Sequence, residues 1–414
     1  MKKRSIKNSF FDHAASLTDP NVRGWQPFTF ESDTDLASPI LGDRSWDLYV
    51  SSPLCTAIVD TLVTNVVGTG LWLAAGDRAL RDAWDDVTAG CGLDGEPLRE
   101  ILELVFRTAI LRGDAFLEVS FAPLTVSVID PRSTVSVGAE APFGIKRDSR
   151  GRATHYLFKA QDDLEIVERP AFTREHGGII HFHMHFIDAR QERGCPLLAP
   201  GLIHLHALSK FTLSEINSAV LTSRVAMAWT RNANLRAGLE EDGEGREEVH
   251  IPDSSVVELL EGEDLRLLQP NRPNPSMDAF ISTVAQKSAA AARLPLSAVL
   301  LVYGSSYTAP RIEILEAQRT YELWRLRIAE TILRPIARAL GFPAGVGWTG
   351  RPAIVVDPLR EVQAAKLRID ESLSTREVEA WDATGMELDE ILDQRAAEER
   401  QILETIPRPL EEMR

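Results

Sequence analysis

The sequence predicts an α+β fold in which helical and strand segments occupy separate parts of the chain. Apolar residues recur at helical spacing over residues 43–67 and 96–111. Between residues 115 and 186 the apolar spacing changes to two, as in half-buried strands. From residue 199 onward the helical spacing returns. With 414 residues and 44% hydrophobic content, the chain can form two or three domains or one elongated protomer.

The first 42 residues are polar and interrupted by proline and glycine. We expect them to form an arm that becomes ordered only against a partner. Helices are expected next, over residues 43–67, 77–87 and 96–111. Strands follow the turn at residues 112–114, and we expect them at 115–121, 124–129, in a hairpin over 145–158, and at 179–186.

A long helix is expected over residues 199–229, and residues 232–275 then form a small separate module. This module contains an acidic run and two short strand candidates, at 255–260 and 264–268. Because it lies between two long helices, we expect it to project as a lobe on a helical stalk.

Residues 276–341 predict a helix, a long loop and a second helix. The first helix contains a run of alanines, so neighbouring backbones can approach it closely, which suits crowding around an axis. The loop, residues 294–311, joins an apolar run to a polar run, and loops of this length are often functional. In the second helix Pro335 is expected to cause a kink. The same pattern also fits a helical hairpin within a core.

Beyond residue 341 we expect a loop and then three helices, the first from residue 358 to about residue 371 and the others over 374–383 and 388–403. Three scattered cysteines suggest folding in a reducing compartment. The sequence contains no secretory apolar region and no run long enough to span a bilayer. The formal net charge of −16 argues against a protein that grips nucleic acid by neutralising phosphates.

Three histidines at alternate positions suggest a metal site. On a strand, His181, His183 and His185 would share one face and could bind zinc or another divalent metal, with Asp188 nearby as a further ligand. This pattern makes a metal-dependent hydrolase the alternative function. The same residues also fit a solvated or interface strand face.

Other catalytic motifs are absent or incomplete. A Ser-His-Asp arrangement is set by space and stays open, but no Gly-x-Ser-x-Gly elbow is present. The chain has no P-loop, and Gly68-Thr69-Gly70 lacks the third glycine of a dinucleotide fingerprint. We therefore expect no enzymatic activity and no cofactor.

Several short segments are informative through their order and spacing between residues 43 and 400. They include Asn65-Val66-Val67-Gly68-Thr69-Gly70-Leu71, Arg112-Gly113-Asp114-Ala115-Phe116, Ile129-Asp130-Pro131-Arg132, Arg193-Gly194-Cys195-Pro196, Pro273-Asn274-Pro275 and Asp357-Pro358. Together they resemble the lambda-type portal proteins of tailed bacteriophages. Two features depart from that family: the chain is shorter than many members, and the histidine triplet is not typical of them.

The resemblance implies an elongated protomer that assembles into a ring, usually of twelve subunits, at one vertex of an icosahedral capsid. It divides the chain into an arm (1–42), a wing (43–198), a long helix into the stem (199–231), a clip (232–275), a second stem helix (276–293), a tunnel loop (294–311), a long helix behind it (312–341) and a helical crown (342–414).

The resemblance also implies the partners. In the family the ring nucleates the shell, passes double-stranded DNA inward and later outward, and joins the head to the tail. The expected partners are further copies of the chain, the major capsid protein, the terminase large subunit, head-completion or tail adaptor proteins and double-stranded DNA, with no membrane. The ring would be assembled in the host bacterial cytoplasm and remain in the virion as a head-tail connector.

Two sets of site residues follow from this mapping. The loop residues facing DNA would be Tyr303, Gly304, Ser305, Ser306, Tyr307 and Thr308, flanked by Arg293 and Arg311. The clip residues meeting a partner would be Glu240, Glu241, Asp242, Glu244, Glu261 and Glu263. A lining without net positive charge would let a polyanion slide without a deep binding well.

A further class, a helical scaffold or adaptor through which no DNA passes, stays open at this point.

Overall fold

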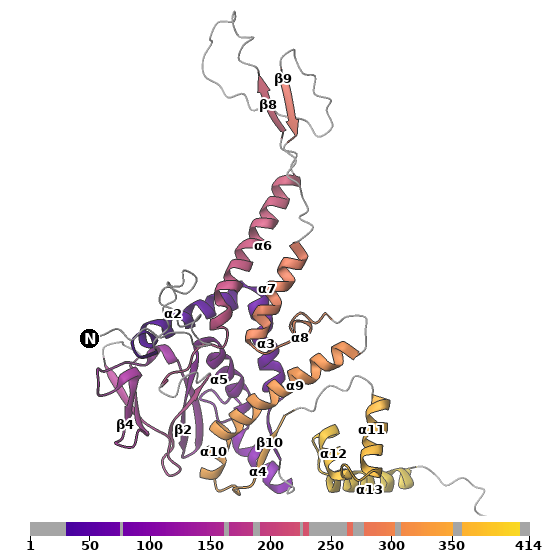
Figure 1. The fold of residues 1–414 in the computed structure, drawn as a ribbon. Helices are drawn as coiled ribbons and strands as arrows, with labels where there is room; N and C mark the ends of the chain where they lie inside the picture. The colour runs from indigo at the N-terminus through magenta and orange to yellow at the C-terminus, as the bar shows by residue number, and fades with distance from the viewer. Residues whose placement is uncertain are drawn as a thin grey trace, which may run out of the picture. The chain divides into compact units, whose positions relative to one another are not determined.

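The computed structural model describes residues 30–74, 78–160, 165–184, 191–223, 227–231, 263–267, 277–302, 308–350 and 358–405. The chain divides into two compact units, one made of Met1–Leu202 with Ala289–Arg414 and the other of Ile203–Ser288. Both units contain helices and strands, so the predicted α+β class is confirmed (Figure 1).

The N-terminal helices differ from the prediction. Helix α2 (Phe30–Ser51) begins well before residue 43 and continues through Pro39 and Gly42, while α3 (Pro53–Val66) starts afresh at Pro53. Gly42 does not break α2, because its missing side chain admits Arg112: an added Cβ would lie 3.2 Å from Arg112 Cδ. The predicted single helix over 43–67 was therefore wrong at Ser52, where proline takes the first helical position.

Helix α3 forms the centre of the first unit's helical core. Its residues Ile58, Val59 and Leu62 are completely buried. It packs against α5 (Leu98–Arg112), α8 (Leu296–Leu300) and α9 (Thr308–Ile328). The helix predicted at 77–87 is α4 (Arg78–Thr88). A short pairing of β1 (Trp72–Ala74) with β10 (Gly347–Thr349) was not predicted, because each strand is only three residues long.

Two antiparallel sheets follow α5. One has the order β3-β2-β7 and the other β4-β5-β6. Their strands are β2 (Asp114–Phe121), β3 (Leu124–Ile129), β4 (Ile145–Arg147), β5 (Ala153–Lys159), β6 (Ile166–Pro170) and β7 (Gly178–His183). A cluster of buried apolar residues joins the two sheets around Phe116, whose ring meets those of Tyr156 and Phe158 at 5.6 and 5.3 Å. Strand β6 was not predicted, because most of its residues are exposed and it lacks an apolar alternation.

The described residues of the second unit form two helices and a two-stranded sheet. Helix α6 (Leu202–Ser223) ends earlier than predicted, and β8 (Met227–Arg231) occupies residues assigned to that helix. Strand β8 pairs antiparallel with β9 (Glu263–Leu267), so pairing with a distant segment decides its conformation. Helix α7 (Met277–Ala291) confirms the predicted helix and meets α6 through the rings of Phe211 and Phe280, 5.1 Å apart. The strand candidate at 255–260 lies outside the described residues.

The long helix expected over 312–341 begins at Thr308 and is interrupted. Helix α9 leads into a π-helical turn, η5 (Ala329–Leu333), and then into α10 (Arg334–Ala339). The turn ends two residues before Pro335, which has no N–H to offer the carbonyl of Thr331. Pro335 therefore marks a break in the helix, as predicted.

Three helices close the described chain, α11 (Pro358–Asp370), α12 (Arg376–Thr384) and α13 (Leu388–Thr405), which confirms the three predicted here. Ion pairs connect them to the rest of the unit, including Arg81 with Glu390 at 2.7 Å. Among the described helices, none combines the length and apolar character needed to cross a membrane.

Candidate functional site

The predicted tunnel loop is partly ordered by its own secondary structure. After α7 the backbone turns at Arg293, which has a φ of 56°, and α8 then occupies five residues expected to be loop. Helix α8 ends at Leu301 in the left-handed region. Residues 303–307, with both predicted tyrosines, lie outside the described residues, and Thr308 is the first residue of α9.

The two flanks of the loop are connected to each other. The Thr320 hydroxyl of α9 donates a hydrogen bond to the Arg293 carbonyl at 3.2 Å. The Ser297 hydroxyl of α8 donates to the Glu313 carboxylate of α9. Leu294 and Val299 are buried beneath these contacts. The base of the loop is therefore fixed to the helix that follows it.

The two arginines predicted beside the loop have different surroundings. Arg293 is exposed. Arg311 forms an ion pair with Glu361 of α11, in which both side chains are partly exposed. Sequence reasoning missed Glu361 and Glu313 as loop neighbours, because no local pattern connects Arg311 with Glu361, 50 positions away, or Ser297 with Glu313, 16 positions away. Of the two positive charges predicted at the loop, one is thus balanced within the chain.

Most of the predicted clip residues cannot be placed. Glu240, Glu241, Asp242, Glu244 and Glu261 lie outside the described residues. Glu263 is the first residue of β9, where the register sets it opposite Arg231 of β8.

Strand β7 brings His181 and His183 to one face, as predicted, with ring centroids 5.3 Å apart. His185 lies outside the described residues. The His181 ring stacks on Phe116 at 4.5 Å, and its Nε2 lies 2.8 Å from Asp114 Oδ1. The His181 side chain is only 10% exposed, so the alternative of a solvated strand face was wrong for this residue in the protomer.

Asp114 is the centre of a buried polar group. Its carboxylate accepts hydrogen bonds from Arg193 Nε and the Gly194 backbone N–H, both at 2.6 Å, and contacts His181. We call these four residues the Asp114 cluster. Burial by itself would raise the pKa of Asp114, but the charge of Arg193 and the contacts with His181 outweigh it and hold the pKa well below its usual range. The carboxylate therefore stays ionised although it is fully buried.

Arg193 connects this cluster to the turn after β3. Its guanidinium donates to the Thr134 hydroxyl at 2.6 Å and to the carbonyls of Phe143 and Pro131 at 3.3 Å. One side chain thus joins β2 to the residues that link the two sheets. The arrangement stabilises the fold and leaves Asp114 no free oxygen for acid–base chemistry.

His183 is held neutral. Burial lowers its pKa to about 3, and the neighbouring His181 and Arg327 act in the same direction. Neutral imidazole is the form that binds metals, but among the described residues no three His, Cys, Asp or Glu side chains are close enough together to hold an ion. The described part of the chain therefore gives the hydrolase alternative no metal site.

Two glycines bring distant motifs into contact. A Cβ added to Gly194 would lie 1.9 Å from the Gly113 carbonyl oxygen, and one added to Gly113 would lie 2.5 Å from the Gly194 carbonyl oxygen. The segments Arg112-Gly113-Asp114 and Arg193-Gly194-Cys195-Pro196 therefore cross at backbone distance. Sequence analysis noted both segments but gave no sign that they meet.

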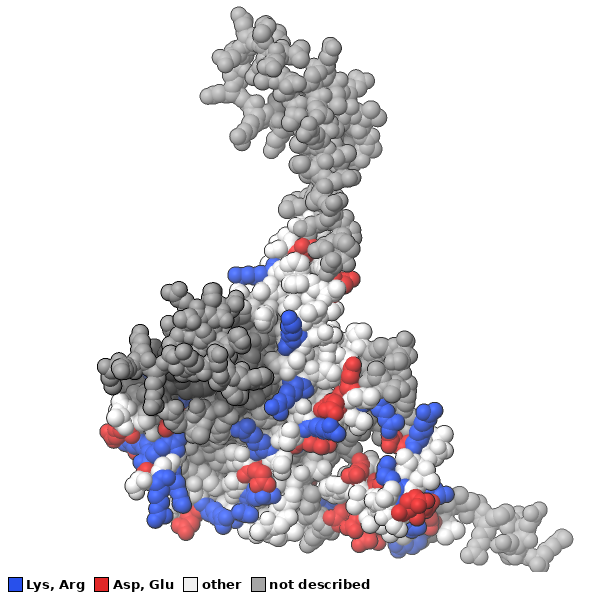
Figure 2. Space-filling view, in the orientation of Figure 1, with Lys and Arg blue, Asp and Glu red and all other residues white. Residues whose placement is uncertain are grey.

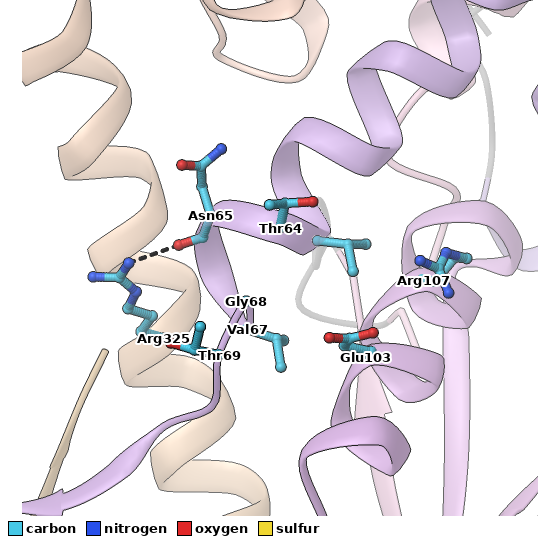
Figure 3. A pocket seen from close by; sticks show the side chains of 9 residues that line it. Thr64, Asn65, Val67, Gly68, Thr69, Glu103, Arg107 and Arg325 are labelled. Atoms are coloured by element: carbon cyan, nitrogen blue, oxygen red, sulfur yellow. Dashed lines mark hydrogen bonds between the residues drawn. The ribbon is translucent and has the colours of Figure 1, made fainter. Parts of the chain in front are cut away.

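A cavity of about 230 Å³ lies where α3 ends. Figure 3 shows Arg325 reaching from α9 toward that end, where its Nη2 donates to the Asn65 carbonyl at 2.6 Å and its Nε to the Val66 carbonyl at 3.3 Å. A cation at the C-terminus of a helix complements the helix dipole and satisfies carbonyls that have no partner within the helix. Arg325 is a structural residue that sequence analysis missed.

The comparisons identify the family. A sequence model described as phage portal protein, lambda family, matches residues 18–325. The chain belongs to the lambda family of phage portal proteins. The match includes the Asp114 cluster, both described strands of the second unit and the loop with its two flanks.

Solved structures similar to this portal protein include chains from gene transfer agent (GTA) particles. A chain from the virion of a native GTA particle is 13% identical with a TM-score of 0.56, and the match covers 84% of this chain and 91% of that one. A chain from the neck of a native GTA particle computed with C12 symmetry is also 13% identical, with a TM-score of 0.54 and coverage of 86% and 94%. These matches show a shared fold. No curated protein matches the sequence.

Proposed function

We propose that this phage portal protein assembles with copies of itself into a closed ring, and that double-stranded DNA is packaged and ejected through the ring. The observation that carries the proposal is the family match, because its range, residues 18–325, includes the wing motifs and the loop. The neck chains of GTA particles with the same fold support it, since their structures were computed with C12 and C6 symmetry.

In this proposal each region of the chain has its own role in the portal. The β2 and β5 sheets with α3–α5 form the wing, α6 and α7 the stem, the β8-β9 pair part of the clip, and α11–α13 the crown. In this assignment the clip meets the terminase large subunit and the head-completion or tail proteins. The wing meets the major capsid protein, and the ring lies at the portal vertex of the virion.

The loop between α8 and α9 would face the DNA. Its base is fixed by the Thr320–Arg293 and Ser297–Glu313 hydrogen bonds, so only the polar middle is left to touch a duplex. The ion pair between Arg311 and Glu361 removes one positive charge from the flank. A weakly charged contact suits a passage, because each lysine or arginine that neutralises a phosphate adds a salt-sensitive binding term and would slow sliding.

Deleting Ser305–Thr308 tests this assignment. We expect rings of normal size in negative-stain images but a large loss of packaged DNA per particle. A matched variant with those residues replaced by a Gly-Ser run of equal length separates the effect of loop length from that of its side chains. A normal yield of packaged DNA from the deletion variant, with rings intact, would contradict a role in the passage.

A further inference from the structure

Helix α9 presents apolar side chains on two opposite faces. On one face Ala317, Tyr321 and Ile328 are buried within their own protomer. On the other face are Ile312, Leu315, Leu323 and Leu326, which we call the α9 stripe. Their exposed fractions are 57, 52, 60 and 57%. A helix that is apolar on both sides is normally buried on both sides.

The geometry of the helix places the four stripe residues in one row, with Arg319 between its two halves. Positions 312, 315, 319, 323 and 326 follow the i, i+3, i+7, i+11, i+14 spacing that places residues along one face. At 1.5 Å per residue the stripe is roughly 21 Å long. Isolated exposed leucines need no explanation, but a row of this length marks an interaction surface.

The charges on this face indicate what kind of partner it takes. Arg319 lies in the middle of the stripe and pairs with Glu316 at 2.7 Å, and both side chains are largely exposed. Figure 2 shows Lys and Arg side chains mixed with Asp and Glu side chains on the visible surface of the molecule. A balanced surface of this kind lacks the net positive charge that DNA requires, so it fits a protein.

We propose that the α9 stripe packs against a neighbouring copy of this chain. The inference rests on the ring in the proposed function, because every subunit of a cyclic ring must present two different surfaces to its neighbours. An apolar row with an internally balanced ion pair fits such a permanent contact, whose centre excludes water and unpaired charge. In this proposal a second protomer buries the stripe, whereas α3 of the same protomer packs against α9 from within.

A double variant with Leu323→Glu and Leu326→Glu tests the proposal. Both residues are exposed in the protomer, so the variant should keep the wild-type circular dichroism spectrum. We expect the fraction of chains in closed rings, measured by native mass spectrometry, to fall at least tenfold. The matched control changes two other exposed leucines that are not part of the α9 stripe, Leu93→Glu with Leu104→Glu, and should form rings as the wild type does.

Wild-type ring yield from the α9 double variant would overturn the proposal while leaving the proposed function intact. Failure of the wild-type chain itself to form rings would instead contradict the proposed function.

A second measurement does not depend on how the double variant folds. Benzoylphenylalanine at position 323, in particles assembled from mixed ¹⁴N- and ¹⁵N-labelled chains, should give cross-linked peptide pairs that carry both labels. Cross-links confined to one label, or formed only with a different protein, would overturn the proposal.

Discussion

The Asp114 cluster and the α9 stripe differ in what surrounds them within the protomer. Asp114 is fully buried, and three hydrogen bonds from its own chain satisfy it. The α9 stripe leaves four large apolar side chains more than half exposed. A charged group is thus enclosed while leucine and isoleucine face outward, which reverses the usual distribution. The Asp114 cluster is therefore buried and hydrogen-bonded within a single chain, whereas the α9 stripe would be buried only by further copies of the chain.

The most damaging change in the first region is expected at Gly194. Gly194→Ala would place a Cβ 1.9 Å from the Gly113 carbonyl oxygen, and neither backbone can move without breaking the cluster. We expect no folded protein at 37 °C, measured as the soluble yield and the near-ultraviolet circular dichroism signal. Gly345→Ala is the control, since nothing lies within 4 Å of its added Cβ. Equal soluble yields and circular dichroism signals from the two variants would mean that the backbones at Gly113 and Gly194 can separate enough to accept a methyl group.

Asp114→Asn should have the next largest effect. It keeps the shape of the side chain but leaves Arg193 without its carboxylate, and breaking a buried pair costs about 3–5 kcal/mol. Denaturant unfolding measures the loss. Asp130→Asn is the matched control, because Asp130 pairs with Arg132 at a partly exposed site where about 0–1 kcal/mol is expected. Comparable losses from the two variants would remove the distinction between a buried and an exposed pair.

The pH dependence of stability should depend on His183. Its pKa is about 3 in the folded protein, against the ordinary 6.5 of the unfolded chain. The unfolded state therefore binds more protons between these values, and stability decreases as the pH falls from about 6.5 toward 3.

Each pKa unit corresponds to about 1.4 kcal/mol, so between pH 7 and pH 5 His183 should account for about 2 kcal/mol. His183→Gln should remove that part of the decrease in urea unfolding experiments, whereas His176→Gln, in an exposed turn, should leave it unchanged. An unaltered pH profile for His183→Gln would show that the imidazole is not held neutral.

The smallest effect is expected in the α9 stripe. Arg319→Ala removes an exposed ion pair, so protomer stability should change by less than about 0.5 kcal/mol. The change is measured by thermal unfolding. Arg319→Ala is introduced into the Leu323→Glu, Leu326→Glu double variant, which is expected to stay monomeric, and its stability is compared with that of the double variant alone. A change in protomer stability above about 1 kcal/mol would mean that the stripe stabilises the single protomer. The stripe would then no longer differ from the Asp114 cluster in this respect.

Segments with a clear period could be predicted from the sequence. Helix α5 and strands β2 and β3 match their predicted ranges closely, because their apolar residues recur with the period of a helix or a strand. Strand β8 could not be predicted, since its conformation depends on β9 more than thirty residues later. In α2 the proline and glycine suggested a break, but packing against α5 overrides that local preference.

The candidate sites also divide into features with a local sequence pattern, which could be predicted, and long-range contacts, which could not. Sequence pattern placed His181 and His183 on one face and indicated the segments around Gly113 and Gly194 as informative. It could not show that Asp114 and Arg193 meet, because a contact across 79 positions has no local signature. The α9 stripe escaped notice for another reason: apolar residues on both faces of α9 weaken its amphipathic pattern.

Cryo-electron microscopy of the assembled wild-type chain tests the central claim most directly. We predict a closed ring in which residues 303–307 of every copy surround one shared hole wide enough for duplex DNA. A single protomer that does not assemble, or a ring that carries this loop on its outer rim, would contradict the account.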